Sequence, residues 1–163
     1  MNTEPQKEHQ WLQKLVGEWT YESDCPPEPG KPPAKSTGTE SVRSLGGLWV
    51  QAEGRGEMPG GGAATMVLTI GYDPQKKRYV GTWIGSMMSY LWVYEGAVDV
   101  TGNKLTLHTE GPDMAVEGKT AKYKEVIEFK NEDQREFTSH MLGEDGKWQA
   151  LMTVHYHKAP KAA

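Results

Sequence analysis

Residues 134–157 read QREFTSHMLGEDGKWQALMTVHYH, two runs of alternating apolar and polar side chains separated by Gly143-Glu144-Asp145-Gly146. This alternation predicts two antiparallel strands joined by a hairpin loop. With residues 143–146 as the loop, the register pairs Met141 with Trp148, Ser139 with Ala150 and Phe137 with Met152. That face is almost wholly apolar, so we expect it to face an enclosed core. The opposite face should meet solvent, and it carries Glu136, Thr138, His140, Gln149, Leu151, Thr153, His155 and His157.

The same period of two extends upstream through most of the chain. It predicts strands near residues 17–22, 36–44, 48–56, 64–72, 78–86, 90–100, 103–110, 120–130, 134–142 and 147–157. Ten strands favour a closed or nearly closed barrel, because closure removes exposed edges. Only residues 6–16 differ, since Trp11, Leu12 and Leu15 form a one-sided stripe of helical period. We therefore predict an all-β fold: one antiparallel barrel of about ten strands over residues 17–157, capped at one end by a short N-terminal helix.

Length and charge restrict the class of protein further. The 163 residues fit one domain over residues 1–163. A net charge of −4 without a basic run offers no footprint for nucleic acid or an anionic membrane surface. The lone Cys25 cannot form an internal disulfide, and the first ten residues, MNTEPQKEHQ, are polar. We expect a cytoplasmic monomer or homodimer that binds neither nucleic acid nor membranes.

The residues expected inside the barrel are rich in tryptophan, tyrosine and methionine, where a plain core would favour Leu, Ile and Val. Amphipathic rings suit a cavity that holds a ligand or ordered water. The alternative is a core filled by side chains, as small barrels allow. The candidate ligand-binding residues are Trp19, Met66, Leu68, Trp83, Tyr90, Trp92, Tyr94, Phe137 and Met152.

Several short motifs resemble known families. Gly17-Glu18-Trp19 is similar to the G-x-W signature of lipocalins and other calycins, in which the Trp closes the barrel base, and Leu15–Trp19 after a helix also resembles the opening of nitrobindin-type barrels. The whole pattern most resembles DUF1579, a bacterial family of unknown function, through Leu45-Gly46-Gly47-Leu48-Trp49, Gly71-Tyr72-Asp73-Pro74 and Tyr79-Val80-Gly81-Thr82-Trp83-Ile84. The chain departs from that pattern at Gly85, where the family has Asp, and at Tyr156-His157-Lys158, where it has Tyr-x-Arg. The resemblance implies a lipocalin-like barrel and brings no activity.

Candidate chemistry is sparse. His155 and His157 share one strand face with Glu136 nearby, a spacing that can start a metal site, but the register places all three outside. The nitrobindin likeness implies haem on a His near the C-terminus, which would require the last strand to be flipped or bulged. Tyr90, Tyr94 and Ser139 could position a substrate oxygen, whereas no carboxylate–His pair is expected on their face. Two further features lie near the expected barrel rim: Met87-Met88, which could gate a ligand or cap the core, and the proline-rich loop 25–33.

We therefore predict a barrel that binds a small hydrophobic molecule in an aromatic-lined cavity, without a cofactor or metal. A metal-independent lyase or isomerase acting in the same cavity is the first alternative. Nitrobindin-like haem binding is the second, and a partner-binding barrel with a filled core is the third.

Overall fold

The computed structural model describes residues 4–24, 35–57 and 61–160. The chain begins with helix α1 (Lys7–Leu12) and a 3-10 turn, η1 (Gln13–Leu15). The strands are β1 (Gly17–Asp24), β2 (Lys35–Leu45), β3 (Trp49–Glu57), β4 (Ala63–Asp73), β5 (Arg78–Gly85), β6 (Trp92–Val98), β7 (Lys104–Pro112), β8 (Thr120–Asn131), β9 (Gln134–Leu142) and β10 (Trp148–Lys158). The predicted all-β class is confirmed, and the expected helix over residues 6–16 consists of α1 followed by η1.

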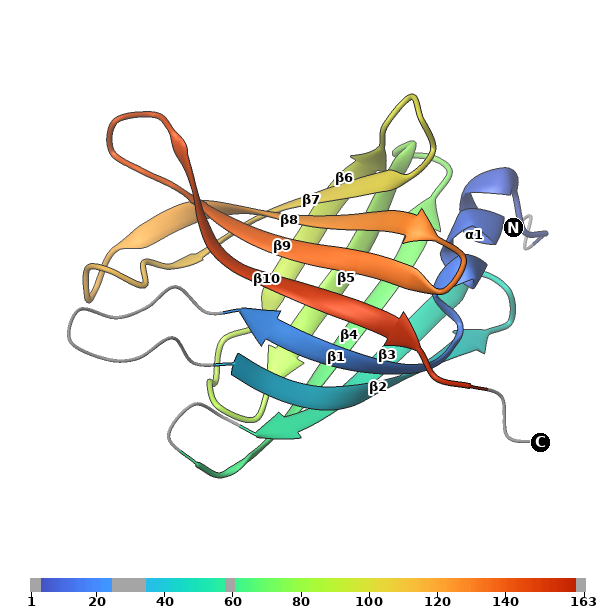
Figure 1. Cartoon of the computed structure of the whole chain (residues 1–163). Coiled ribbons are helices and arrows are strands. Elements are labelled where there is room, and N and C mark those ends of the chain that lie inside the picture. The colour runs from blue at the N-terminus through green and yellow to red at the C-terminus, as the bar shows by residue number, and fades with distance from the viewer. Residues whose placement is uncertain (1–3, 25–34, 58–60, 161–163) are drawn as a thin grey trace.

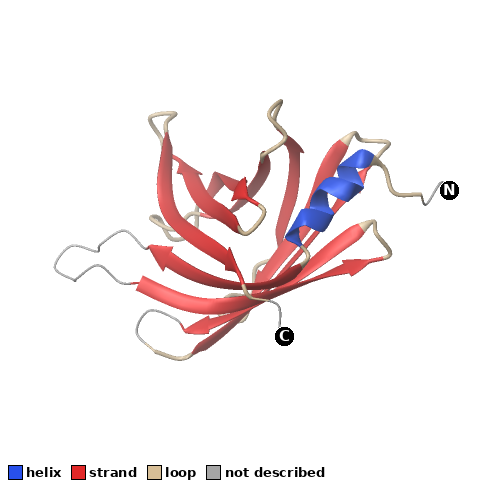
Figure 2. Cartoon of the chain, turned by 45° about the vertical axis from the view of Figure 1, so that its right-hand side comes forward, coloured by secondary structure: helices blue, strands red, loops and turns tan. Residues whose placement is uncertain are grey.

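The ten strands form a closed antiparallel barrel in which each strand pairs with its neighbours in sequence and β1 pairs with β10. Figure 1 shows α1 at one end of the barrel, with the β7–β8 and β9–β10 turns at the other. In Figure 2 the helix, drawn in blue, lies beside the ends of strands of the barrel. No helix among the described residues is long and apolar enough to cross a membrane.

The helix is fixed to the barrel by its apolar face and a few specific hydrogen bonds. Leu12 and Leu15 are buried, and the Trp11 indole donates to the backbone oxygen of Gly102, 2.6 Å away. Gly102 supplies that oxygen from a turn in which its φ is +77°, a conformation that favours glycine. The Tyr79 hydroxyl donates to the Glu8 backbone oxygen at 3.0 Å. The helix therefore covers this end of the barrel.

The predicted register of the last hairpin is wrong. Trp148 pairs with Leu142 and Gln149 with Met141, so the connecting loop runs from Gly143 to Lys147, one residue longer than expected. A β-bulge at Leu151 then adds a second residue, and beyond it Met152 pairs with Ser139 and Val154 with Phe137. Because the two offsets together amount to two residues, Met152 keeps the inward orientation predicted for it.

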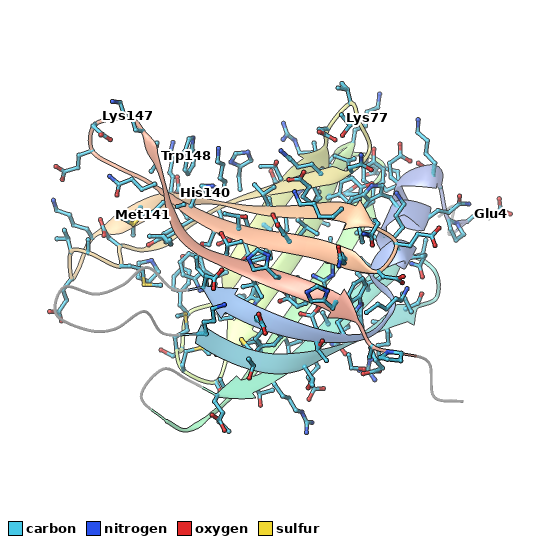
Figure 3. All side chains as sticks on the ribbon, viewed as in Figure 1. Glu4, Lys77, His140, Met141, Lys147 and Trp148 are labelled. Carbon is cyan, nitrogen blue, oxygen red and sulfur yellow. The ribbon has the colours of Figure 1, made fainter. Side chains whose placement is uncertain are left out.

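The side chains before the bulge have the opposite orientation to the prediction. Trp148 is 36% exposed and its ring lies under the Lys124 ammonium, 4.8 Å from the ring centroid, on the outer surface. Figure 3 shows Trp148 and Lys147 at the end of the β9–β10 hairpin away from α1. Leu151, expected in solvent, instead lines the interior. An extra residue in a strand reverses the facing of everything on one side of it.

Candidate functional site

The barrel interior holds a cavity of about 340 Å³ in the half away from α1. Its lining includes residues from the strand ends and turns of that half, among them Ser36, Glu57 and Met114. The half next to α1 is filled by buried side chains such as Leu12, Ile70 and Leu105. The filled-core alternative therefore describes only one half of the barrel.

Most of the candidate ligand-binding residues border this cavity. They are Met66, Leu68, Trp83, Trp92, Tyr94, Phe137 and Met152. Trp19 does not; it is 1% exposed at the base, where its indole donates to the Leu15 backbone oxygen at 2.8 Å. Tyr90 was expected inside, but it precedes β6, is 38% exposed and donates to the Glu110 backbone oxygen at 3.0 Å. The expected inward orientation of Tyr90 is wrong because the strand begins two residues later than predicted.

The floor of the cavity is a buried ion pair that the sequence reasoning missed. An Arg135 guanidinium nitrogen contacts a Glu40 carboxylate oxygen, and both residues are buried. The guanidinium lies between two aromatic rings, 4.6 Å from the Trp19 centroid and 3.8 Å from that of Tyr156. Burial raises the pKa of the Tyr156 hydroxyl, and the Glu40 carboxylate raises it further. The pair thus neutralises itself at the bottom of the cavity.

A second buried carboxyl, Glu125 on β8, borders the cavity without an opposite charge. It is 7% exposed, and its Oε1 accepts a hydrogen bond from the Ser139 hydroxyl at 3.1 Å across the β8–β9 pairing. Its Oε2 is buried and has no hydrogen-bond partner among the described residues. Burial raises the pKa of this carboxyl to about 7, although the bond from Ser139 lowers it in part. Glu125 is therefore poised between its neutral and ionised forms near physiological pH.

Aromatic side chains of β6 and β8 line the same cavity as this carboxyl. Trp92 meets Tyr123 edge to face at 5.0 Å between ring centroids, and its indole donates to the Met88 sulfur at 3.2 Å. Tyr94 is 4% exposed, and burial together with the Glu125 charge raises the pKa of its hydroxyl. The cavity wall here offers aromatic rings and the Tyr94 hydroxyl.

Strand parity alone could have located these buried charges. Arg135 shares its phase with Phe137, and Glu125 shares its phase with Tyr123 and Ile127, all of which point inward. Their charge argued for solvent instead, because Glu and Arg are almost never fully buried unless paired. For Arg135 the missing information was a partner 95 residues away.

At the rim, Met87 and Met88 both border the cavity. Gly85, where the family pattern has Asp, leaves room for them, since a Cβ there would lie 2.4 Å from the Met87 sulfur. The loop 25–33, including Cys25, lies outside the described residues, and so do residues 58–60.

The histidines do not form the metal or haem sites considered. The His155 ring lies on the outer surface, 3.2 Å from an Asp24 oxygen and 3.4 Å from a Glu136 oxygen. No group of three potential metal ligands occurs among the described residues. No histidine of the described ranges borders the cavity, because the bulge at Leu151 brings Val154 and Tyr156 inward and leaves His155 and His157 outside.

These features define a closed antiparallel barrel with an internal cavity in the half away from α1. The chain belongs to the family described as "Protein of unknown function (DUF1579)", which it matches over residues 4–158. A comparison with curated proteins finds no match. Among solved structures it is similar to Rv2717c from M. tuberculosis, with 12% identity and a TM-score of 0.64 over 96% of this chain and 100% of that one. It is also similar to the S-type phycobiliprotein lyase CPES from Guillardia theta, with 14% identity and a TM-score of 0.55 over 97% of this chain and 100% of that one. At such identities the likeness concerns the fold.

Proposed function

We propose that this barrel binds a small, mostly apolar molecule in its cavity. The observation that carries the proposal is the cavity itself: about 340 Å³ bordered by Trp83, Trp92, Leu68, Phe137 and Met152. Ligand pockets are typically about 300–1,000 Å³, mainly apolar, with a few polar groups that orient the ligand. The Tyr94 hydroxyl and the Glu125 carboxyl are polar groups of that kind. We further propose that the protein acts as a monomer or homodimer in the cytoplasm, with the small molecule as its partner.

Native mass spectrometry of the freshly purified protein, followed by tryptophan fluorescence with a library of apolar molecules, tests this function. Trp83 and Trp92 border the cavity, so an occupant should change their emission and raise the melting temperature. Ala64→Phe provides the blocking variant because Ala64 is buried and borders the cavity, whereas its neighbour Ala63 is exposed. We expect Ala64→Phe to weaken binding at least about tenfold, which is about 1.4 kcal/mol, and Ala63→Phe to leave it unchanged. Failure of every compound to alter emission or melting would refute the proposal.

A metal-independent isomerase or lyase in the same cavity is the second candidate. Glu125 favours it, because a carboxyl with a pKa of about 7 can donate and accept a proton at neutral pH. This function predicts that Glu125→Gln abolishes turnover of a bound substrate while the affinity stays nearly unchanged. Equal losses of turnover and affinity would favour binding alone.

A further inference from the structure

Only one of the two Glu125 carboxyl oxygens has a hydrogen-bond partner among the described residues. Its Oε1 accepts from Ser139, while Oε2 is shielded from solvent and has no partner among the described residues. A buried acceptor without a donor is costly, since it has lost its water and gained nothing in return. A ligand that donates to this oxygen would remove the deficit.

The charges that border the cavity are unbalanced. They comprise Glu40, Glu57, Glu125 and Arg135. Glu40 and Arg135 contact each other at the floor, and Glu57 is exposed at the end of β3. No ion pair reaches Glu125 within the described ranges. When ionised, this carboxylate therefore meets no cation from the described residues.

The wall beside Glu125 is also suited to a cation. Tyr123 precedes Glu125 by two residues on the same buried face of β8, Trp92 packs against Tyr123, and the charge of Glu125 raises the pKa of both the Tyr94 and the Tyr123 hydroxyl. The faces of such rings attract cations, most strongly where water is excluded. A carboxylate in a cavity that tryptophan and tyrosine rings also line is a setting that favours an ammonium group.

We propose that the cavity selects molecules with an apolar body and one protonated amine, whose ammonium donates to Glu125 Oε2 while the body occupies the space between Trp83 and Phe137. This inference rests on the proposed function, because it requires a ligand in the cavity. The ammonium supplies both the missing donor and the missing positive charge. An alcohol of the same skeleton would supply the donor alone.

The pH dependence separates an amine from a neutral ligand. The groups that face Glu125 are Ser139 on β9, Leu107 on β7, Tyr94 on β6 and Tyr123 on its own strand. Both tyrosines have raised pKa values and stay neutral, so only Glu125 titrates near pH 7. Amine binding needs the ionised carboxylate, and its affinity should fall about tenfold from pH 8 to pH 6 as Glu125, with a pKa of about 7, is protonated. A ligand that accepts a hydrogen bond from the neutral acid would show the reverse.

Isothermal titration calorimetry with arylalkylamines, from phenylbutylamine to naphthylethylamine, and the alcohol of each skeleton tests the inference. At pH 8 we expect the amines to bind at least about tenfold more tightly than their alcohols. Glu125→Gln should abolish that preference and leave alcohol binding intact. Glu110→Gln removes the same charge from the exposed end of β7 and should change nothing. At pH 6, titrations in buffers of different ionisation enthalpy should show that binding releases about one proton.

The possible results separate this inference from the proposed function. If alcohols and amines bind equally, or Glu125→Gln retains the amine preference, the amine inference is wrong and the binding function stands. If neither class binds while other apolar molecules shift the melting temperature, the inference is again wrong. If nothing binds, both proposals fall.

Discussion

Replacing Glu125 by Gln should stabilise the protein at alkaline pH, because the fold now holds this carboxyl in a site that disfavours its charge. Raising the pKa from 4.5 to about 7 corresponds to about 3 kcal/mol, at about 1.4 kcal/mol for each pKa unit. The folded state binds the proton more tightly than the unfolded chain, so this group lowers stability as pH rises from 4.5 to about 7. The destabilisation is nearly absent at pH 4 and complete at pH 8.

Urea unfolding of both proteins at pH 5 and pH 8 measures this effect. From the pKa of about 7, the charge costs the native protein about 1 kcal/mol at pH 5 and about 3 kcal/mol at pH 8. The advantage of Glu125→Gln should therefore grow by about 2 kcal/mol between the two conditions. Any fixed cost of burying the new amide cancels in that difference. Glu110→Gln, on the exposed surface, should show no such change, and an advantage of Glu125→Gln that is independent of pH would refute the reasoning.

Three further tests by substitution concern the architecture around the cavity. Arg135→Met leaves the Glu40 charge buried without its partner and should cost about 3–5 kcal/mol in urea unfolding, with partial recovery when Glu40→Gln is added. Trp148 lies on the outer surface, so Trp148→Ala should lower the free energy of unfolding by less than about 1 kcal/mol. Trp92 is 5% exposed in the cavity wall, so Trp92→Ala should lower it by about 3–5 kcal/mol. Equal losses would contradict the assigned register. Trp11→Phe leaves the Gly102 carbonyl without its donor and should lower the free energy of unfolding by about 1–3 kcal/mol, and no measurable loss would show that α1 is held by its apolar face alone.

Alternation in the sequence was sufficient to predict the barrel, because burial on one face of a strand imposes a period of two that local residues express directly. Trp83 and Met152 both border the cavity as that period requires. The hairpin register was not predictable in the same way. Ala150-Leu151-Met152 is apolar at every position, so it contains no polar residue to mark which side chain is the extra one in the bulge.

The chemistry of the cavity was harder to predict than its walls. For a hydrophobic residue inside a barrel, its position in the strand alternation and its apolar side chain both predict an inward orientation. For Glu125 and Arg135 the alternation predicts an inward orientation, whereas the charge predicts an outward one. The disagreement is resolved by tertiary contacts: Glu40 is brought to Arg135 by barrel closure, and Ser139 is brought to Glu125 by the β8–β9 register. A single sequence does not encode either contact in a local pattern.

The two buried acids differ in a way that bears on function. Glu40 is matched by Arg135, whose guanidinium packs against the Tyr156 ring, so its charge is balanced within the protein. Glu125 has a hydroxyl partner for one oxygen and none for the other among the described residues, so we expect its ionised form to reduce stability at neutral pH. Residues that break the rules of a packed interior without internal compensation are expected at functional sites. The ligand that we propose for the cavity would supply this compensation, and Glu125 is the residue through which its identity can be tested.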